Sequence, residues 1–193
     1  MRHLRILFSG ALLGGICLAG AGLGAAPDAA AAGAPMVASE EKVEAAYLHK
    51  FLNYAEWPPA VFPAADSPYV IGVAGDDTVA DELARIAAGR SVNNRGVVVK
   101  RLLPGDAVNE LHMLFVGRGE RGRQAQWLRP AKGRPILTVT AFDGALEQGS
   151  IINFRTVDDR VRFEVSVDAA DQSDIRLSSR LFTVATNVVK GNR

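Results

Sequence analysis

The residues best suited to chemistry are Gly75, Asp76 and Asp77. They follow the apolar run Tyr69 to Ala74 and precede a helical pattern, which is the position where open α/β sheets bind ligands. Two neighbouring carboxylates there could act as an acid–base pair or hold a hard cation. A helix cap and a turn would explain the same residues, because no second carboxylate cluster and no glycine fingerprint accompanies them. Asp76 and Asp77 are therefore candidate ligand residues.

Other chemistry has few residues to draw on. Beyond the N-terminal segment the chain has no cysteine, and its only histidines are His49 and His112. A zinc-type site needs several such ligands, so we expect no metal and no cofactor. We expect His49 on the polar side of a helix and His112 as a hydrogen-bonded histidine at the edge of the core. No serine lies in a G-x-S-x-G elbow, so no catalytic residue is expected.

Residues 1–33 have the pattern of a secretory signal peptide and a flexible leader. Two positive charges at Arg2 and Arg5 precede the uncharged stretch Ile6 to Leu23. Small residues from Ala25 to Ala32 offer several cleavage positions. A retained membrane anchor is the alternative, but the Gly- and Ala-rich composition favours cleavage. We therefore expect an exported protein that is not inserted in the membrane after cleavage.

The remaining domain is electrically balanced. Loss of residues 1–33 removes Arg2, Arg5 and Asp28, so the formal charge falls from +1 to 0. Nucleic acids and anionic membrane surfaces are normally bound by a basic excess, so neither is expected as the main partner. Cys17 is lost with the same segment, which leaves no thiol for a disulfide. A domain of about 160 residues can bury a core without such a link.

The first element expected to position these residues is a helix. Its apolar side is formed by residues at spacings of four, four and three: Val43, Tyr47, Phe51 and Tyr54. Ser39 is a suitable N-cap, so the helix is expected to begin near Glu40. Pro58 and Pro59 are expected to end it.

Strand and helix patterns then alternate. The apolar runs predict strands at Tyr69 to Ala74, Gly96 to Leu103, Leu111 to Val116 and Arg134 to Thr140. Asp77 or Thr78 is expected to cap a helix that runs to about Ala88. A second helix is expected from Glu120 to Pro130, with short helical turns at residues 104–110 and 143–148. This alternation is typical of a largely parallel α/β sheet.

The last third of the chain has a different pattern. Ile151 to Arg155 and Val161 to Val167 flank the turn-forming pair Asp158 and Asp159, which predicts an antiparallel hairpin. Leu177 to Val189 is expected to form a final amphipathic helix. The predicted fold is a single α/β domain over residues 39–190. Its sheet is mostly parallel and twisted, flanked by helices, with an antiparallel C-terminal hairpin.

Several motifs resemble the YfiR-like family of periplasmic proteins, in order along the whole domain. They are Val43-x-x-Ala-Tyr-Leu-x-x-Phe-x-x-Tyr-x-x-Trp-Pro58, Ile71-Gly-Val-x-Gly-Asp76, Leu114-Phe-Val116, Arg134-Pro-Ile-Leu-Thr-Val139, Gly149-x-Ile-Ile-Asn-Phe154, Arg160-Val-Arg-Phe-Glu-Val165 and Leu177-Ser-Ser-x-Leu181. None of these motifs is catalytic.

The resemblance implies a non-enzymatic periplasmic regulator. Its well-known relatives bind the periplasmic domain of an inner-membrane diguanylate cyclase and repress it, which lowers cyclic di-GMP and biofilm formation. Similar domains also occur in sensor kinases, and dimers are known in the family, so a sensor kinase partner and a homodimer are further expectations. Well-known relatives carry cysteines in the mature domain. This chain carries none there, so redox control through its own disulfides is not expected.

A partner surface is expected on the C-terminal hairpin and the turn that follows it. Phe154, Glu164, Ile175 and Leu177 are the candidate partner-binding residues, because edge strands and apolar residues in polar-flanked turns often bind partners. Ordinary edge packing is the alternative for each of them. Glu164→Lys is expected to weaken partner binding and to leave thermal stability almost unchanged.

Two other functions remain open on the sequence alone. The first is a periplasmic small-ligand sensor that acts on another membrane signalling protein, with its pocket at the carboxyl ends of the strands Tyr69 to Ala74 and Leu111 to Val116. A ligand-induced rise in melting temperature would favour it. The second is a hydrolase that uses Asp76 or Asp77, which requires activity to be lost in Asp76→Ala.

Overall fold

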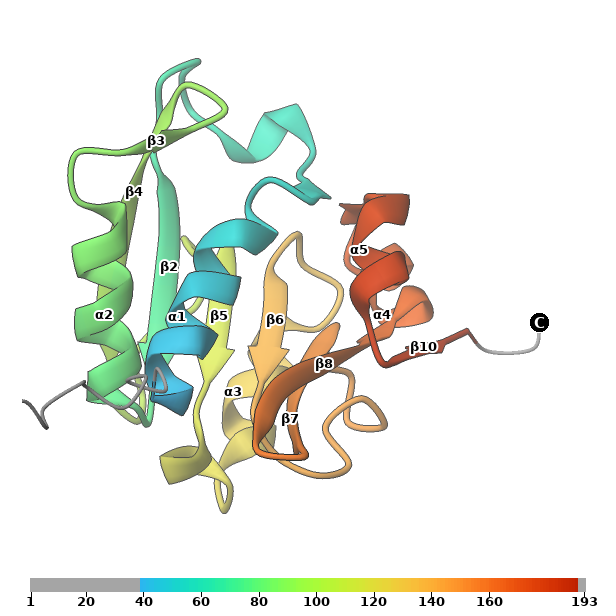
Figure 1. Ribbon diagram of the computed structural model, residues 1–193. Coiled ribbons are helices and arrows are strands. Elements are labelled where there is room, and N and C mark those ends of the chain that lie inside the picture. Colours follow the sequence, from blue (N-terminus) through green and yellow to red (C-terminus); the bar gives the residue numbers. More distant parts are fainter. Residues whose placement is uncertain (1–38, 191–193) are drawn as a thin grey trace, which may run out of the picture. The chain divides into compact units, whose positions relative to one another are not determined.

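The computed structural model describes residues 39–190, whose central element is an eight-stranded sheet (Figure 1). The predicted signal peptide and leader, residues 1–33, lie outside the described residues. The sheet has the strand order β10-β8-β7-β6-β5-β2-β4-β3. Its strands are β2 (Tyr69–Ala74), β3 (Ser91–Val92), β4 (Arg95–Leu102), β5 (Met113–Val116), β6 (Leu137–Thr140), β7 (Ile152–Val157), β8 (Arg160–Ser166) and β10 (Asn187–Val189). A separate two-stranded sheet pairs β1 (Ala55–Glu56) with β9 (Arg176–Leu177).

Most neighbouring strands are parallel. The parallel set β4-β2-β5-β6-β7 is continuous, and β10 pairs parallel with β8. β7 and β8 form the predicted antiparallel hairpin, with Asp158 and Asp159 in the left-handed region at φ 48° and 54°. Two such residues match the twist of the flanking strands. The predicted α/β class, with a mostly parallel sheet and an antiparallel hairpin, is confirmed.

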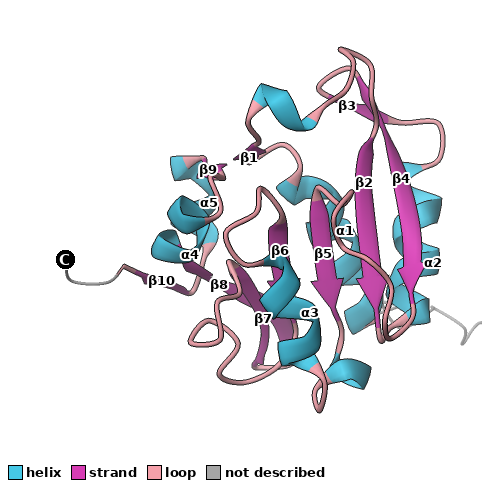
Figure 2. Cartoon of the chain, turned by 180° about the vertical axis from the view of Figure 1, so that it is seen from behind, coloured by secondary structure: helices cyan, strands magenta, loops and turns pink. Residues whose placement is uncertain are grey.

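Helices cover both faces of the sheet. α1 (Glu40–Phe51) and α2 (Asp77–Ala87) lie in front of it in Figure 1, and α3 (Gln124–Ala131) lies against the opposite face in Figure 2. Alternate strand residues supply the two cores: Ile71 belongs to the cluster with α1, and Leu114 and Val116 belong to the cluster with α3. The central strands are therefore buried on both faces, which explains their continuous apolar sequences.

Aromatic rings fill the core between α1 and the hairpin. The rings of Phe51 and Phe163 lie 5.1 Å apart between centroids, and those of Tyr47 and Phe163 lie 5.5 Å apart. Phe154 stacks on Phe51 at 5.8 Å. The helical spacing of Tyr47 and Phe51 thus positions two rings against the last third of the chain.

The first helix is shorter than its periodicity predicts. It ends at Phe51, where the Tyr54 N–H donates to the Phe51 carbonyl, and the chain then forms β1. The expectation that the helix continues to Pro58 is wrong. Ser39 occupies the N-cap position, but its side chain makes no capping hydrogen bond.

The expected final helix from Leu177 to Val189 is also wrong. Its residues form part of β9, then α5 (Ser179–Val184) and the strand β10. The chain leaves the helix after Val184 because Thr186 donates its N–H and its hydroxyl to the Phe163 carbonyl, both at 2.9 Å. A further short helix, α4 (Val167–Gln172), begins where a strand was expected to end.

Smaller differences concern the other helices. Asp76, rather than Asp77 or Thr78, is the N-cap of α2. A 3-10 turn at Arg118–Glu120 precedes α3, and another at Pro59–Val61 follows β1. Residues 104–110 and 143–148, expected to contain helical turns, form turns and irregular chain.

Candidate functional site

Asp76 and Asp77 follow β2 as predicted, and both have structural partners. Asp76 Oδ1 accepts a hydrogen bond from the Val79 N–H at 2.9 Å and so caps α2. Asp77 is exposed and lies 3.5 Å from the Arg101 guanidinium. A ligand role for the two carboxylates stays a prediction, but the capping contact alone explains an aspartate at position 76.

The carboxyl ends of β2 and β5 pack directly on each other next to these aspartates. Gly75 has φ +74°, and a Cβ added to it would lie 2.8 Å from the backbone nitrogen of Glu120. The Gly117 N–H donates to the Ala74 carbonyl at 2.8 Å, and Gly119 donates to Gly75 at 3.3 Å. The glycines at this position therefore serve close backbone packing.

Glu120 anchors the loop after β5. Its carboxylate accepts from Arg123 at 2.6 and 2.8 Å and from the Trp127 indole at 3.0 Å. The hydrogen bonds from Arg123 lower the pKa of Glu120 to about 2, in spite of burial. Trp127 is thus a core residue whose polar atom is satisfied.

Arg118 connects two acids of α1. Its Nη1 donates to Glu44 Oε1 at 3.0 Å, and its Nη2 donates to Glu40 Oε1 at 2.6 Å. The Thr156 hydroxyl donates to the same Glu40 oxygen. This cluster joins α1, the loop after β5 and the end of β7.

Glu44 is the most unusual ionisable group of this cluster. Its side chain is completely buried, and its second oxygen, Oε2, has no hydrogen-bond partner among the described residues. Burial raises the pKa of Glu44 to about 7, although the charge of Arg118 opposes this shift. The carboxyl group therefore changes charge near neutral pH.

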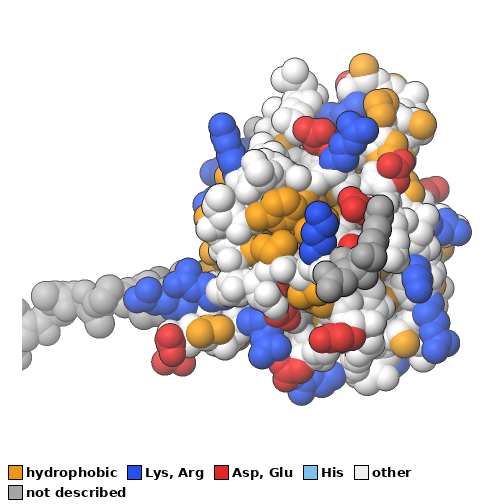
Figure 3. Space-filling model, turned by 90° about the vertical axis from the view of Figure 1, so that its right-hand side faces the viewer, with side chains coloured by type: hydrophobic (Ala, Val, Ile, Leu, Met, Phe, Trp, Pro, Cys, Tyr) orange, Lys and Arg blue, Asp and Glu red, His pale blue; other side chains and the backbone are white. Residues whose placement is uncertain are grey.

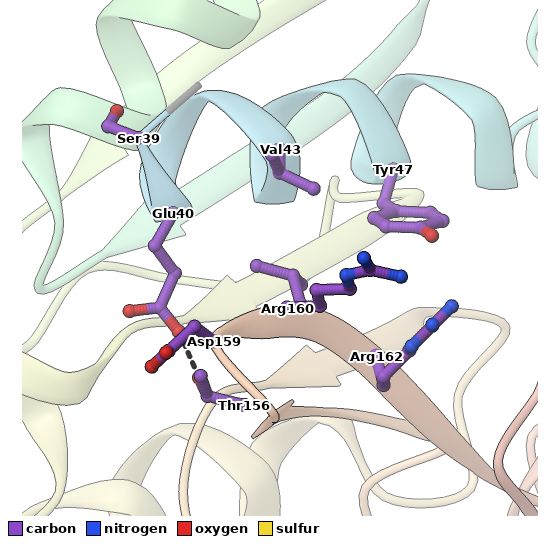
Figure 4. Close-up of a pocket in the computed structure, with 9 residues that line it drawn as sticks. Ser39, Glu40, Val43, Tyr47, Thr156, Asp159, Arg160 and Arg162 are labelled. Carbon is purple, nitrogen blue, oxygen red and sulfur yellow. Dashed lines mark hydrogen bonds between the residues drawn. The ribbon is translucent and has the colours of Figure 1, made fainter. Parts of the chain in front are cut away.

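A groove lies beside this cluster, between α1 and the β7–β8 hairpin (Figure 4). It has a volume of about 620 Å³ and is open to solvent. The residues that line it are Ser39, Glu40, Val43, Tyr47, Thr156, Asp159, Arg160, Val161 and Arg162. A volume of this size is within the range of binding sites for small molecules or short peptide segments.

Unpaired cations surround the apolar part of this groove. Figure 4 shows the guanidinium groups of Arg160 and Arg162 on the side of the groove nearest Tyr47. Lys42 and Lys50 line a second hollow, of about 300 Å³, which shares Tyr47 with the first. None of these four cations has a hydrogen bond or ion pair within residues 39–190.

Two of the four predicted partner-binding residues lie in the core. Phe154 is 1% exposed and Ile175 is 2% exposed. Leu177 is half-buried, packs against the same core and pairs with Ala55 across the small sheet. The partner-binding role stays a prediction, and burial means that Phe154 and Ile175 would act through the packing of their neighbours.

Glu164, the fourth of these residues, belongs to a polar network on the α3 side of the sheet. It accepts from Asn153 Nδ2 at 3.0 Å and lies 4.0 Å from the Arg155 guanidinium. Asn153 Oδ1 in turn accepts from the Thr140 hydroxyl at 2.8 Å and from the Phe142 N–H at 3.2 Å. The Glu164 side chain is 18% exposed, so it is largely buried among these groups.

Exposed hydrophobic side chains occur on the face that carries α5 and β10. Figure 3 shows hydrophobic side chains gathered there beside a basic one. Val184 of α5 is 60% exposed, and Val188 and Val189 of β10 are 39% and 40% exposed. This is the side of the molecule on which the predicted hairpin edge lies.

His112 occupies the core-edge position expected of it, whereas His49 is more buried than a solvated residue on the polar side of a helix. His112 Nδ1 accepts from the Val70 N–H at 3.0 Å, its carbonyl accepts from the Trp57 indole at 2.9 Å, and burial lowers its pKa. His49 is half-buried, and its Nε2 has no partner among the described residues.

Two features of residues 39–190 bear on metals and membranes. No group of three or more His, Cys, Asp or Glu side chains there is arranged to hold a metal ion. Within the same residues no helix has both the length and the apolar character needed to span a membrane.

The Glu44–Arg118 cluster and the cationic groove were missed by reasoning from the sequence. Glu44 carries a local signal, because it lies four residues before Leu48 and so falls on the apolar side of α1. No local sequence signal identifies Arg118, Arg160 or Arg162, because their positions around α1 depend on pairings between distant segments.

The chain is similar to a known protein family. A family model described as YfiR/HmsC-like matches residues 41–186, which includes nearly all of α1, every strand of the eight-stranded sheet except β10, and α5. A search of curated proteins finds no match.

Proposed function

The chain belongs to the YfiR/HmsC-like family, and from this membership we propose that it binds and represses an inner-membrane diguanylate cyclase. The family is one of periplasmic regulators of cyclic di-GMP signalling, and its members are regulatory rather than catalytic. Repression would lower cyclic di-GMP and biofilm formation. The match over residues 41–186 is the observation that carries the proposal.

Location in the periplasm is part of this proposal. The charged start and uncharged apolar stretch of residues 1–33 support export by a cleavable signal peptide. Fractionation of cells, followed by N-terminal sequencing of the purified protein, tests it. A protein that keeps Met1 and stays with the membrane fraction would contradict cleavage.

The partner surface that we propose includes the β7–β8 hairpin and β9. Leu177 would contact the partner directly, since it is half-buried at the surface of the small sheet. Phe154 would affect partner binding indirectly, by holding Tyr47 in place. The centroids of the two rings lie 6.0 Å apart. Ile175 would act by holding β9 against the core, and Glu164 by fixing the hairpin through Asn153.

Calorimetric titration of the purified protein against the periplasmic domain of the candidate cyclase tests this function. We expect micromolar or tighter binding, with a stoichiometry that reports whether the protein binds as a monomer or as a homodimer. Deletion of the gene is expected to raise cellular cyclic di-GMP. No binding by a folded sample, together with unchanged cyclic di-GMP, would contradict repression of that cyclase, and a sensor kinase would be titrated next.

A further inference from the structure

The outer edge of β8 is only partly covered. β10 pairs with Glu164, Val165 and Ser166, and among residues 39–190 no strand pairs with the outer edge of β8 between Arg160 and Phe163. The groove beneath α1 lies along this uncovered part, since Arg160, Val161 and Arg162 line it. One strand position of the sheet is thus vacant at the groove.

The backbone of β8 is oriented to pair with a chain in this position. The Ser166 N–H donates to Ile151 toward β7, and the Phe163 carbonyl accepts from Thr186 on the opposite side. Alternate residues of a strand direct their backbone groups to opposite edges. Val161 has the same parity as Phe163, so its N–H and C=O point toward the vacant position.

The side chains around the groove favour an acidic occupant. Arg160 and Arg162 lie on the strand side, and Lys42 and Lys50 on the helix side, all four without an ion pair in the described chain. Between them Tyr47 provides apolar surface, together with Val43, Ala46 and Val161. Carboxylates on either side of an apolar side chain would complement this arrangement.

Two acids at the other end of the groove, Glu40 and Asp159, determine where along the groove an acidic occupant is favoured. Glu40 is already paired with Arg118 and hydrogen-bonded by Thr156, and Asp159 has no partner in the described chain. An acidic occupant is therefore favoured near Arg162 and Lys50 and disfavoured near Asp159.

We propose that an extended acidic segment of the membrane partner binds in this groove and adds a strand to the open edge of β8, in line with β10. The identity of the partner rests on the proposed function. From Ser39 to Lys50 the helix is about 16 Å long, which corresponds to about five residues of extended chain. Backbone pairing to Val161 would supply affinity, and the cations would select acidic side chains.

A peptide binding experiment on the full-length protein tests the groove. The probe is a fluorescent peptide in which glutamate alternates with valine, and the control peptide has lysine in place of glutamate. Fluorescence anisotropy should show saturable binding of the acidic peptide only, weakening as salt rises. Equal binding of both peptides, or no binding of the acidic one, overturns the proposal.

Charge-reversal variants locate the binding. Arg160→Glu/Arg162→Glu and, separately, Lys42→Glu/Lys50→Glu should each weaken binding of the acidic peptide at least about tenfold. Arg129→Glu/Lys132→Glu, on exposed residues of and after α3, makes the same change of charge and should alter binding less than about twofold. Thermal melting checks that each variant is folded. Equal losses of peptide affinity in all three variants would indicate a general charge effect and would overturn the assignment of the binding site to the groove.

Cellular measurements separate this inference from the proposed function. If gene deletion raises cyclic di-GMP but the groove variants repress fully, the groove is not the partner site and the proposed function stands. If the peptide binds in the groove but deletion leaves cyclic di-GMP unchanged, the proposed function fails and the binding site stands. A second copy of this chain as occupant would appear as a dimer that the groove variants abolish, which also overturns the proposal.

Discussion

The guanidinium of Arg118 donates to the fully buried carboxyl group of Glu44 at 3.0 Å, across 74 positions of sequence. One arginine nitrogen thus supports a buried acid, while another holds Glu40 at the start of the same helix. The two contacts attach the beginning of α1 to the loop after β5. Because the pKa of Glu44 is raised to about 7, this attachment depends on pH.

Stability should fall between pH 5 and pH 8 because of Glu44. Its folded-state pKa of about 7 lies above the usual glutamate value of 4.5, so the folded protein binds more protons than the unfolded chain in this interval. The stabilising contribution is fully present below pH 4.5 and is lost as pH rises through 7. Relative to Glu44→Gln, the wild-type free energy of unfolding should drop by up to about 3 kcal/mol. Urea denaturation at several pH values measures it, with Glu147→Gln as an exposed control. Identical pH profiles for wild type and Glu44→Gln would contradict the prediction.

Glu120 should have the opposite pH dependence. Hydrogen bonds from Arg123 lower its pKa to about 2, so its contribution is present above the usual value of 4.5 and is lost as pH falls through 2. Glu120→Gln should cost about 1–3 kcal/mol at pH 7 and almost nothing near pH 2. Glu82→Gln removes a pair of the same spacing, with Arg85, whose acid is less buried (17% exposed against 6% for Glu120), and should cost less than about 1 kcal/mol. Denaturation of both variants at pH 7 compares the two pairs, and similar losses of stability would contradict the prediction.

Gly75→Ala should be much more destabilising than Gly89→Ala. The two glycines have similar φ angles, +74° and +67°, so the backbone strain of a side chain is comparable. A Cβ at Gly75 would lie 2.7 Å from Glu120 Cγ, whereas at Gly89 no atom lies within 4 Å. We expect a loss of about 1 kcal/mol for Gly89→Ala and of several kcal/mol for Gly75→Ala. Equal melting temperatures for the two variants would contradict the prediction. They would show that the chain at Gly75 can move away from Glu120 without loss of stability.

Glu164→Lys should reduce stability, which changes the expectation drawn from the sequence. A lysine would place its charge beside the Arg155 guanidinium and leave the Asn153 amide without its acceptor. We expect a loss of about 1–3 kcal/mol in denaturation experiments. Leu177→Asp lies outside this network and should weaken partner binding, with a loss of stability of its own because Leu177 packs against the core. If Glu164→Lys melts like wild type, the residue is free to contact a partner as the sequence suggested.

Local sequence patterns predicted correctly the elements whose tertiary contacts favour the same secondary structure. The run Tyr69 to Ala74 is a strand with the predicted bounds, because every position faces apolar groups on one side of the sheet or the other. The hairpin was found through Asp158 and Asp159, whose left-handed backbone suits a two-residue turn.

Long-range pairing explains the failures. Leu181, Val184 and Val188 have helical spacing, but Val188 pairs with Val165 in the sheet and Val184 is exposed. β-branched residues accept a strand readily, so tertiary contact decided the outcome. The groove was unpredictable for the same reason, since it requires Tyr47 and Arg162 to meet across the fold.

The small sheet has a consequence for the order of folding. β1 pairs Ala55 with Leu177, and the Ser178 N–H donates to the Tyr54 carbonyl at 2.8 Å. The segment that ends α1 therefore has no partner until almost the whole chain has been synthesised. Such distant pairing slows folding, and the aromatic side of α1 also stays uncovered until Phe154 and Phe163 of the hairpin pack on it. A chaperone that binds exposed apolar helices would therefore bind α1 before the chain has folded.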